Sequence, residues 1–395
     1  MFTKVLILSS SVGAGHVRAA EALERAFLES GAARDVRHVD TLKYANKLYS
    51  WLYVEGNSYM VHRMPTVAGW LYDALDKPWR NERQRVAFDR FNSRPLVRML
   101  QEYQPEIAVC THFLPAGILS SLKAADRRTP RQTTVITDLD IHAMWLSRGC
   151  EHYFVAIDEA RARLEGFGIA AHQITVTGIP VDPVFSLPKN KSEMRHKHGL
   201  PDGRPTILVS AGRLRLGPLE HIMNSLATLR RQVQAIIVCG GNEEVRKRVE
   251  QSVTRLPADA LVTFKIVGLS SEMDELMAAS DIFVGRPGGL TTAEALASGL
   301  AFVIVTPIPG QEERNSDHLL EEGVAIRCND LSLLAYKLER LLDDTKRLQS
   351  MKESATRIAR PRAAFAVVET LLGLRGNRWN GATGREERKE SRGWA

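Results

Sequence analysis

The residues near the start of the chain that are best suited to chemistry follow a short apolar run. Lys4–Leu8 is predicted to be a buried strand; Ser9-Ser10-Ser11-Val12-Gly13-Ala14-Gly15-His16 comes next, and Val17–Leu28 has the apolar spacing of a helix. A glycine turn between a strand and a helix presents backbone N–H groups to an anion, and His16 adds one imidazole at the helix start. The alternative reading is that His16 is a surface or capping residue.

A second turn of this kind lies in the carboxy-terminal half, at Asp281-Ile282-Phe283-Val284-Gly285-Arg286-Pro287-Gly288-Gly289-Leu290-Thr291-Thr292-Ala293-Glu294. The pattern predicts a buried strand and a helix that opens near Leu290. Unpaired N–H groups and the positive helix end would make a diphosphate site there, which Gly288 and Gly289 would let a ligand approach. Glu294, one turn into the helix, is placed to accept hydrogen bonds from ribose hydroxyls. A plain strand–helix turn is the alternative.

The next predicted strand, Phe302–Val305, is followed by Thr306-Pro307-Ile308-Pro309-Gly310-Gln311-Glu312-Glu313-Arg314-Asn315. Gln311, Glu312 and Asn315 offer planar donors and acceptors suited to sugar hydroxyls, and we expect them on one loop. A solvated polar loop is the alternative. Two adjacent segments of this kind, in this strand order, favour a nucleotide-sugar site.

Two polar segments follow strands of the amino-terminal half. Thr111 and His112 follow the predicted strand Ile107–Cys110. Thr137 ends the predicted strand Gln132–Thr137, and Asp138, His142 and Trp145 come after it. A carboxylate beside an imidazole can deprotonate a hydroxyl or orient the group that does. The spacing of His112, Asp138 and His142 lacks metal character, so we predict no metal site. For Trp145, filling of the core is an equally good interpretation.

The elements that must position these residues alternate between short β-branched runs and helical stretches, which predicts an α/β fold with parallel sheets. The chain is long enough for two domains, and we expect two doubly wound Rossmann-like domains facing a cleft, with ligands at the carboxyl ends of the strands. The predicted parts are an amino-terminal domain (1–180), a linker (181–205), a carboxy-terminal domain (206–360), a closing helix (361–375) and a disordered tail (376–395). The remaining predicted strands are Asp35–Val39, His152–Ala156, Gln173–Thr177, Thr206–Ser210, Ala235–Cys239, Thr263–Val267 and Ile282–Val284.

Composition narrows the class of protein. With 44% hydrophobic and 25% charged residues and no apolar run of about 20 residues, the chain reads as a soluble globular protein of the cytoplasm. Cys110, Cys150, Cys239 and Cys328 are far apart, so buried thiols are expected rather than disulfides. The formal net charge of +7 favours anionic partners.

Much of this charge lies in an aromatic segment. Leu42 to Arg98 holds ten Lys and Arg against five Asp and Glu, and the stretch from Tyr44 to Trp79 holds eight of the chain's fourteen Trp and Tyr. Aromatic rings prefer the bilayer interface and basic side chains attract anionic headgroups, which predicts peripheral docking on a membrane. Packing of a helical insertion is the alternative. No recognised nucleic-acid module accompanies the segment, so nucleic acid is not expected.

From Phe2 to about Leu372 the chain resembles the family 28 GT-B glycosyltransferases, specifically the group of monogalactosyldiacylglycerol synthases and processive diacylglycerol glucosyltransferases. The resemblance is carried by Gly13-Ala14-Gly15-His16, where the family has Gly-Gly-Gly-His, by the T-D-x(3)-H-x-x-W arrangement and by the two carboxy-terminal segments. It implies that Pro287–Thr291 cradles the donor diphosphate, with Leu290 and Thr291 among the contacts, and that Glu294 holds the ribose. It further implies sugar contacts for Gln311 and Glu312, uracil packing for Gly268 and Leu269, and a donor contact for Gly212 in a turn with fewer glycines than the family's.

The resemblance implies inverting transfer of a hexosyl group from UDP-glucose or UDP-galactose to 1,2-diacylglycerol at the inner face of the cell membrane. His16 is the first candidate for the base and Asp138 the second, with Gly13, Gly15, His112, His142 and Trp145 on the acceptor side. UDP-sugar is a co-substrate, and neither a cofactor nor a metal is expected. Three alternatives stay open: N-acetylglucosamine transfer to a lipid-linked peptidoglycan precursor, a UDP-sugar 2-epimerase, and a non-catalytic UDP-sugar sensor.

Overall fold

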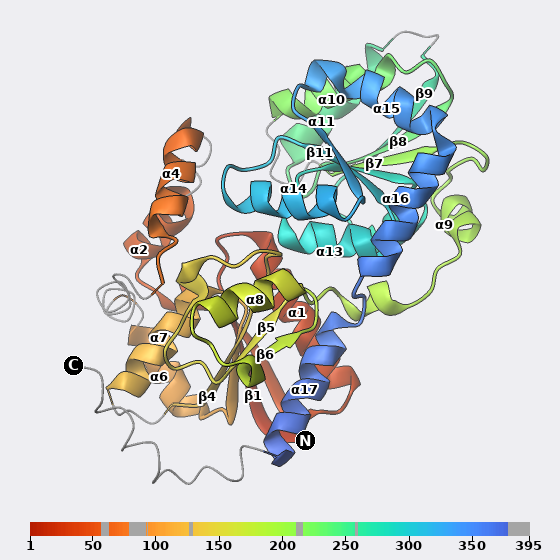
Figure 1. Cartoon of the computed structure of the whole chain (residues 1–395). Helices are drawn as coiled ribbons and strands as arrows, with labels where there is room; N and C mark the ends of the chain where they lie inside the picture. Colours follow the sequence, from red (N-terminus) through yellow and green to blue (C-terminus); the bar gives the residue numbers. More distant parts are fainter. Residues whose placement is uncertain are drawn as a thin grey trace.

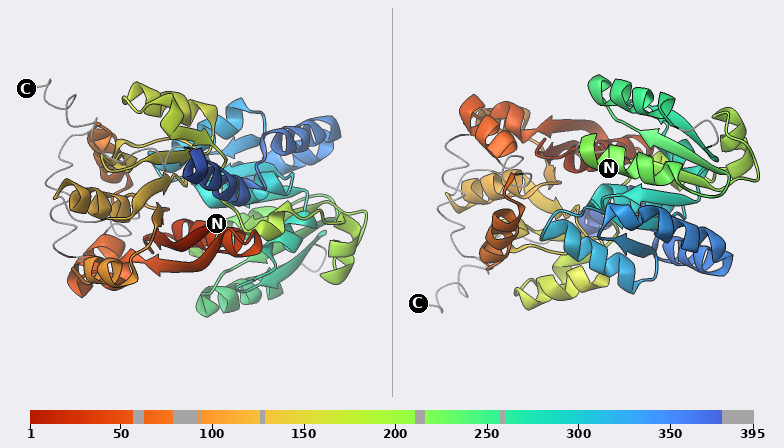
Figure 2. Two further views of the ribbon diagram at one scale, coloured as in Figure 1. Left: turned by 90° about the horizontal axis from the view of Figure 1, so that it is seen from below. Right: turned by 90° about the horizontal axis from the view of Figure 1, so that it is seen from above.

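The computed structural model describes residues 1–56, 63–78, 92, 94–125, 129–210, 216–256 and 260–377. Within them the chain forms two parallel six-stranded sheets flanked by helices (Figures 1 and 2). The first has the order β2-β1-β3-β4-β5-β6, and the second β12-β11-β10-β7-β8-β9. The α/β fold with two doubly wound Rossmann-like domains is therefore confirmed.

The strands of the first sheet are β1 (Phe2–Ser9), β2 (Ala33–Asp40), β3 (Ile107–Cys110), β4 (Arg131–Val135), β5 (His152–Val155) and β6 (Ile174–Val176). Those of the second are β7 (Thr206–Ser210), β8 (Val233–Val238), β9 (Val262–Val267), β10 (Ile282–Gly285), β11 (Ala301–Val305) and β12 (Ala325–Cys328). Most are buried on both faces, as parallel strands covered by helices are, and such strands read as continuous apolar runs.

The helices of the amino-terminal half are α1 (Ala14–Glu29), α2 (Lys47–Trp51), α4 (Pro65–Leu75), α6 (Arg94–Tyr103), α7 (Phe113–Ala124) and α8 (Asp158–Gly166), with the π-turn η2 (Leu52–Gly56) and the 3₁₀ turns η1 (Thr41–Tyr44), η3 (Ala143–Trp145) and η4 (Ala171–Gln173). Those of the carboxy-terminal half are α10 (Leu216–Ala227), α11 (Glu243–Thr254), α12 (Met273–Ala278), α13 (Gly289–Ala297), α14 (Gln311–Glu321), α15 (Leu334–Asp343) and α16 (Thr345–Ile358), with the 3₁₀ turn η6 (Leu331–Leu333).

The chain passes between the two sheets twice. The predicted linker 181–205 contains the 3₁₀ turn η5 (Pro183–Ser186) and helix α9 (Lys191–Lys197). After α16 the chain returns to the first sheet as α17 (Ala363–Asn377), whose Val367 and Leu371 pack in one core cluster with Phe2 and Phe27 (Figure 1). The predicted closing helix, 361–375, falls on α17. Beyond Asn377 the predicted tail lies outside the described residues.

The sequence located most of this framework. Each predicted strand coincides with an observed one, although β4 ends at Val135, before the predicted end at Thr137. The edge strand β12 was not predicted. All four cysteines are buried thiols, as expected, and burial raises the pKa of Cys150 and of Cys239 to about 11 each.

Candidate active site

Each sheet has a point where the strand order reverses, and some of the predicted site residues follow the strands at these points. In the first sheet β1 lies between β2 and β3, and His16 and His112 belong to the connections after β1 and β3. In the second sheet β7 and β10 are neighbours, and the Pro287–Gly289 turn follows β10. Ligands of open α/β sheets bind at such points. Gly212, in the turn after β7, lies outside the described residues.

The starts of α1 and α13 face each other across the two domains. A Cβ placed on Gly15 would lie 3.6 Å from the Cβ of Leu290. A Cβ on Gly289 would lie 2.0 Å from the carbonyl oxygen of Thr137, in the other domain, so no side chain fits there. At Gly288 the nearest atom would be 3.7 Å away. Glycine is therefore required at position 289 because the two domains touch there, a requirement that the sequence did not reveal.

Backbone donors at the start of α13 point out of the helix. Its first residues include Leu290 and Thr291, and the N–H of Thr292 donates to the carbonyl oxygen of Gly288 (2.9 Å). The N–H groups that precede this bond have no acceptor within the helix. They stand where the positive ends of α1 and α13 meet, which is a favourable place for a diphosphate.

His16 is oriented by two other segments. Its Nδ1 lies 3.1 Å from the carbonyl oxygen of Thr111 and 2.7 Å from the Thr137 hydroxyl. Because a carbonyl oxygen only accepts, Nδ1 carries the proton in the neutral ring and Nε2 carries the lone pair. The His16 ring also meets His112 edge-on, at 4.6 Å between centroids. With the proton on Nδ1, the ring has the tautomer that a general base acting through Nε2 requires, and the role of base stays a prediction for His16.

Asp138 is buried at the boundary between the domains. Burial raises its pKa to about 6, against hydrogen bonds from Gln311 and Trp145 that lower it. The Gln311 side-chain amide donates to Asp138 Oδ1 at 2.5 Å. A carboxyl with this pKa can exchange a proton near neutral pH, so the second candidate for the base keeps suitable chemistry.

The predicted acceptor residues lie at the same edge of the first sheet, and several are structural partners. Gly13 is the N-cap residue of α1. His112 caps α7 by accepting the Leu114 N–H, and His142 caps η3 by accepting the Met144 N–H, each at 3.1 Å. Trp145 belongs to a buried core cluster, as the packing interpretation expects. Acceptor contact stays a prediction for all of them.

Glu294 has a partner that the sequence did not point to. Its carboxylate lies 2.8 Å from a guanidinium nitrogen of Arg18, two residues after His16 in the other domain. The Glu294 side chain is 3% exposed and that of Arg18 44%. Burial raises the pKa of Glu294 to about 7, against the opposing charge of Arg18. Arg18 was missed because chain spacing does not reveal pairs across a cleft.

Gln311, Glu312 and Asn315 lie in the first two turns of α14 rather than on a loop, which corrects that expectation. Glu312 accepts two hydrogen bonds from Arg286 and one from the Ile308 N–H, at 2.8 to 2.9 Å. Asn315 is fully buried, accepts the Leu139 N–H and donates to the Pro287 carbonyl. Glu312 and Asn315 therefore hold the donor turn and the two domains in register. Sugar contact stays a prediction for Gln311 and Glu312.

The residues expected to contact uracil follow β9. A Cβ on Gly268 would lie 3.4 Å from the Arg246 side chain and 3.9 Å from the Gly240 carbonyl oxygen, so this turn sits beside the one after β8. Leu269 is 84% exposed. An uncovered apolar side chain at the edge of the sheet is available to a flat base, and this role stays a prediction.

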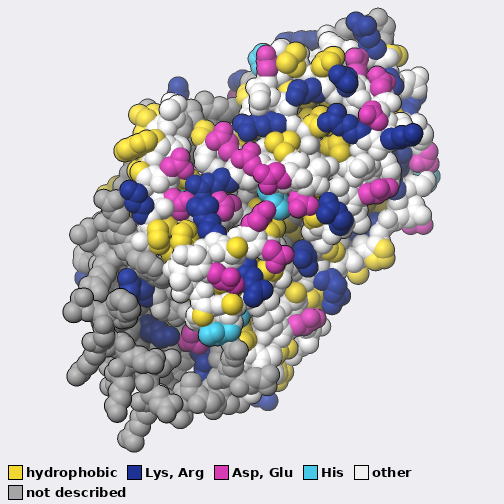
Figure 3. Space-filling model, viewed as in Figure 1, with side chains coloured by type: hydrophobic (Ala, Val, Ile, Leu, Met, Phe, Trp, Pro, Cys, Tyr) yellow, Lys and Arg dark blue, Asp and Glu magenta, His cyan; other side chains and the backbone are white. Residues whose placement is uncertain are grey.

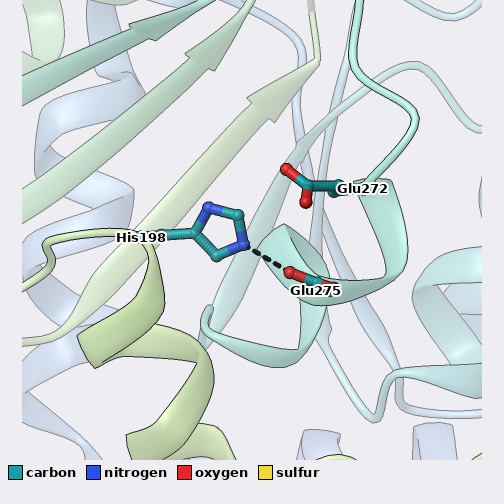
Figure 4. Close-up of side chains that lie close together, drawn as sticks. All are labelled: His198, Glu272 and Glu275. Carbon is teal, nitrogen blue, oxygen red and sulfur yellow. Dashed lines mark hydrogen bonds and ion pairs between the residues drawn. The ribbon is translucent and has the colours of Figure 1, made fainter.

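One cluster among the described residues has ligand atoms close enough for a metal ion: His198, Glu272 and Glu275 (Figure 4). His198 follows α9, and the carboxylates stand at the start of α12. The Lys197 ammonium group already bonds both carboxylates, at 3.0 and 2.6 Å, and His198 Nε2 lies 2.8 Å from Glu275. These contacts tie the linker to the carboxy-terminal domain, which is a structural role.

Some aromatic side chains of the segment from Tyr44 to Trp79 pack in the core, and others are exposed. Tyr49 belongs to a core cluster of the amino-terminal domain, and the partly buried Tyr44 and Tyr53 pack against that cluster. Trp51 and Trp70, in contrast, are 61% and 69% exposed. Tyr59 and Trp79 lie outside the described residues. Among the described helices, none is long and apolar enough to cross a bilayer.

Comparisons with known proteins agree with this geometry. A model of the monogalactosyldiacylglycerol (MGDG) synthase family matches residues 16–181, and one of glycosyl transferases group 1 matches residues 190–358. A processive diacylglycerol beta-glucosyltransferase of Bacillus cereus (strain AH187) is 30% identical over 374 residues, 93% of each chain.

Solved structures share the fold at lower identity. MurG of Acinetobacter baumannii aligns with a TM-score of 0.63 and 17% identity, over 94% of this chain and 99% of its own. The UDP-GlcNAc 2-epimerase of Neisseria meningitidis aligns with a TM-score of 0.61 and 13% identity, over 94% and 100%.

Two facing Rossmann-like domains with these matches define a GT-B glycosyltransferase. Within that class, the chain belongs to the family of the diacylglycerol glycosyltransferases, which includes monogalactosyldiacylglycerol synthase and processive diacylglycerol glucosyltransferase.

Proposed function

We propose that this glycosyltransferase moves a hexosyl group from UDP-glucose or UDP-galactose to the hydroxyl of 1,2-diacylglycerol, with inversion at the anomeric carbon. The observation that carries the proposal is the meeting of the His16 turn with the start of α13, which brings the candidate base to the candidate anion site. The name of the Bacillus cereus relative supports diacylglycerol as the acceptor and glucose as one donor sugar.

In the proposed reaction His16 Nε2 takes the proton of the acceptor hydroxyl. The acceptor oxygen attacks the anomeric carbon from the face opposite UDP, and the bond between that carbon and the β-phosphate oxygen breaks. The charge that develops on UDP is met by the backbone N–H groups at Gly289–Thr291 and the positive end of α13. These donors can fill the role that a metal ion has in other glycosyltransferases, so we expect no metal requirement.

We further propose that α4 and the neighbouring turn of α2 dock on an anionic lipid surface at the inner face of the cell membrane. Exposed large apolar side chains gather on these elements: Leu48, Trp51, Met64, Val67, Trp70 and Leu75. Lys47, Arg63 and Lys77 are exposed beside them. Basic side chains near a membrane surface contribute about 1 kcal/mol each, so the combination favours anionic lipid.

The proposal is tested by giving the protein UDP-glucose, UDP-galactose and UDP-N-acetylglucosamine separately, each with vesicles that contain diacylglycerol. Mass spectrometry with sugar analysis of the lipid extract should find a hexosyl diacylglycerol with one or both of the first two donors. A release of epimer or glycal without lipid would instead indicate a 2-epimerase. Tight binding with no product would indicate a sensor, and transfer of N-acetylglucosamine to a lipid-linked precursor would indicate the peptidoglycan reaction.

A further inference from the structure

One side of helix α4 carries exposed apolar residues. Its other side packs against the segment that is predicted to contact the sugar. A Cβ on Gly69 would lie 3.1 Å from the Cβ of Pro309. Gly310 has a φ of +85°, and a Cβ there would lie 2.8 Å from the ring of Tyr72. The Pro309–Gly310 turn therefore has its shape fixed partly by α4, directly before Gln311.

The end of α4 is held by a carboxylate that both domains bind. Asp76 follows the last turn of α4, and its side chain is 7% exposed. Its Oδ1 accepts the Ala143 N–H at 2.8 Å. Its Oδ2 accepts from Arg163 of the amino-terminal domain at 2.5 Å and from Arg314 of the carboxy-terminal domain at 2.9 Å. We call this set of three contacts the Asp76 clasp.

The surroundings keep Asp76 charged. Burial alone would raise its pKa, but the Ala143 N–H and the two guanidinium groups hold the pKa below its ordinary value. Asp140 accepts from the same two arginines, at 3.0 Å each, and Arg314 lies over the Tyr72 ring. Figure 3 shows charged side chains gathered where α4 approaches α14, with hydrophobic side chains at the outer edge of α4. A buried carboxylate between two guanidiniums is costly to disrupt from either side.

The clasp ends on the helix that carries the sugar-reading side chain. Arg314 stands three residues after Gln311 in α14, so the two share a helix face. Gln311 in turn donates to Asp138 across the domain boundary. Asp76 thereby reaches the site through Arg314 and through the Pro309–Gly310 turn, without touching a substrate itself.

We propose that Asp76 is a positioning residue: it clasps α4 to α14 and so couples the lipid-docking helix to the segment Pro309–Gln311. The Asp76 clasp itself does not depend on the proposed function. The identity of the sugar bound by Pro309–Gln311 and of the lipid bound by α4 does rest on it. Engagement of α4 by a lipid surface then orders the sugar-reading segment, while the UDP contacts at α13 are left unchanged.

The ligand-free test is amide hydrogen exchange of peptides covering residues 306–315. The variants are Asp76→Asn and a matched control, Asp73→Asn, whose side chain is 68% exposed and contacts the same Arg314 at 3.2 Å. We expect exchange to speed up at least about fivefold with D76N and to stay within twofold with D73N, because a buried charged hydrogen bond contributes far more than an exposed one. Equal exchange in wild type and D76N would overturn the clasp. Arg314→Gln, which cuts it from the other domain, serves if D76N does not fold.

Two further experiments distinguish a failure of the Asp76 clasp from a failure of the proposed function. With wild type, anionic vesicles should slow exchange in 306–315, and this slowing should be lost in D76N; bound vesicles that leave wild-type exchange unchanged would overturn the coupling. Calorimetry should find UDP-hexose affinity reduced about tenfold in D76N with UDP affinity within threefold, since the segment is predicted to contact the sugar and not the nucleotide. An equal loss for both ligands would contradict positioning. Failure of vesicles or UDP-hexose to bind wild type would count against the proposed function, while the ligand-free exchange still decides the clasp.

Discussion

His16 Nδ1 lies against the Thr111 carbonyl oxygen and the Thr137 hydroxyl, and the carbonyl contact favours Nε2 as the nitrogen that takes up a proton. We expect His16→Ala to lower kcat by about 10²- to 10⁴-fold, the range of general base catalysis, with UDP affinity within threefold. His221→Ala, an exposed histidine on α10, is the matched control. Steady-state kinetics and calorimetry with UDP give both numbers. Unchanged turnover in His16→Ala would transfer the role of base to Asp138.

Glu294 should leave a signature in the pH dependence of stability. Its pKa is raised to about 7 in the folded chain, from an ordinary value of 4.5. Between these pH values the unfolded chain has lost the Glu294 proton and the folded chain keeps it. The contribution of this group to the free energy of unfolding is therefore complete below about pH 4.5 and is lost as pH rises to about 7.

The free energy of unfolding of wild type should therefore fall relative to Glu294→Gln across this window, by roughly 2 to 3 kcal/mol. Denaturant titrations at pH 5, 6, 7 and 8 measure the difference, and parallel curves for the two proteins would be evidence against the raised pKa. The same variant should bind UDP more weakly if Glu294 holds the ribose.

At the scale of elements, the two neighbouring glycines at the start of α13 differ in the space that a side chain would have. Gly289→Ala would put a Cβ against the Thr137 carbonyl oxygen, whereas Gly288→Ala would meet nothing closer than 3.7 Å. We expect G289A to lower kcat/KM at least about tenfold, because the two domains can no longer approach each other as closely at Thr137, and G288A to stay within threefold. If G288A proved as damaging as G289A, the two glycines would serve ligand approach rather than domain contact.

The exposed face of α4 makes a prediction about lipid. Trp70→Ala should reduce partitioning onto anionic vesicles by about 10- to 100-fold, because burial of a large apolar side chain contributes roughly 1.5 to 3 kcal/mol. Tyr336→Ala, 55% exposed on α15, should partition like wild type. Vesicle sedimentation measures both. Equal partitioning of wild type and W70A would place the docking surface elsewhere.

The sequence predicted features formed by contiguous residues and missed those formed by residues far apart in the chain. Strands such as β1 and β10 were visible because a buried parallel strand is a continuous apolar run. The strand β12 was missed because it is short, lies at the edge and includes a partly exposed Arg327. The donor turn was visible because its residues are contiguous. Arg18 and Asp76 were not, since their partners Glu294 and Arg314 lie more than 200 residues away.

For the whole molecule, the contacts across the domain boundary bring the residues predicted to bind the donor close to those predicted to bind the acceptor. Gly289 against Thr137, Gln311 against Asp138 and Arg18 against Glu294 all join the two sheets at one edge. The carboxy-terminal domain carries the predicted nucleotide site, and the amino-terminal domain carries the candidate base. The proposed reaction requires both, so the site depends on the contacts between the domains rather than on either sheet alone.

The most direct measurement is the linkage formed by wild type from UDP-glucose or UDP-galactose and diacylglycerol vesicles, with His16→Ala run in parallel. Attack opposite the departing UDP converts the α-linkage of the donor into a β-glycoside, so NMR of the purified lipid should show a β-linked hexosyl diacylglycerol from wild type and little or none from the variant. An α-linked product, or no glycolipid while the nucleotide sugar is consumed, would contradict the account.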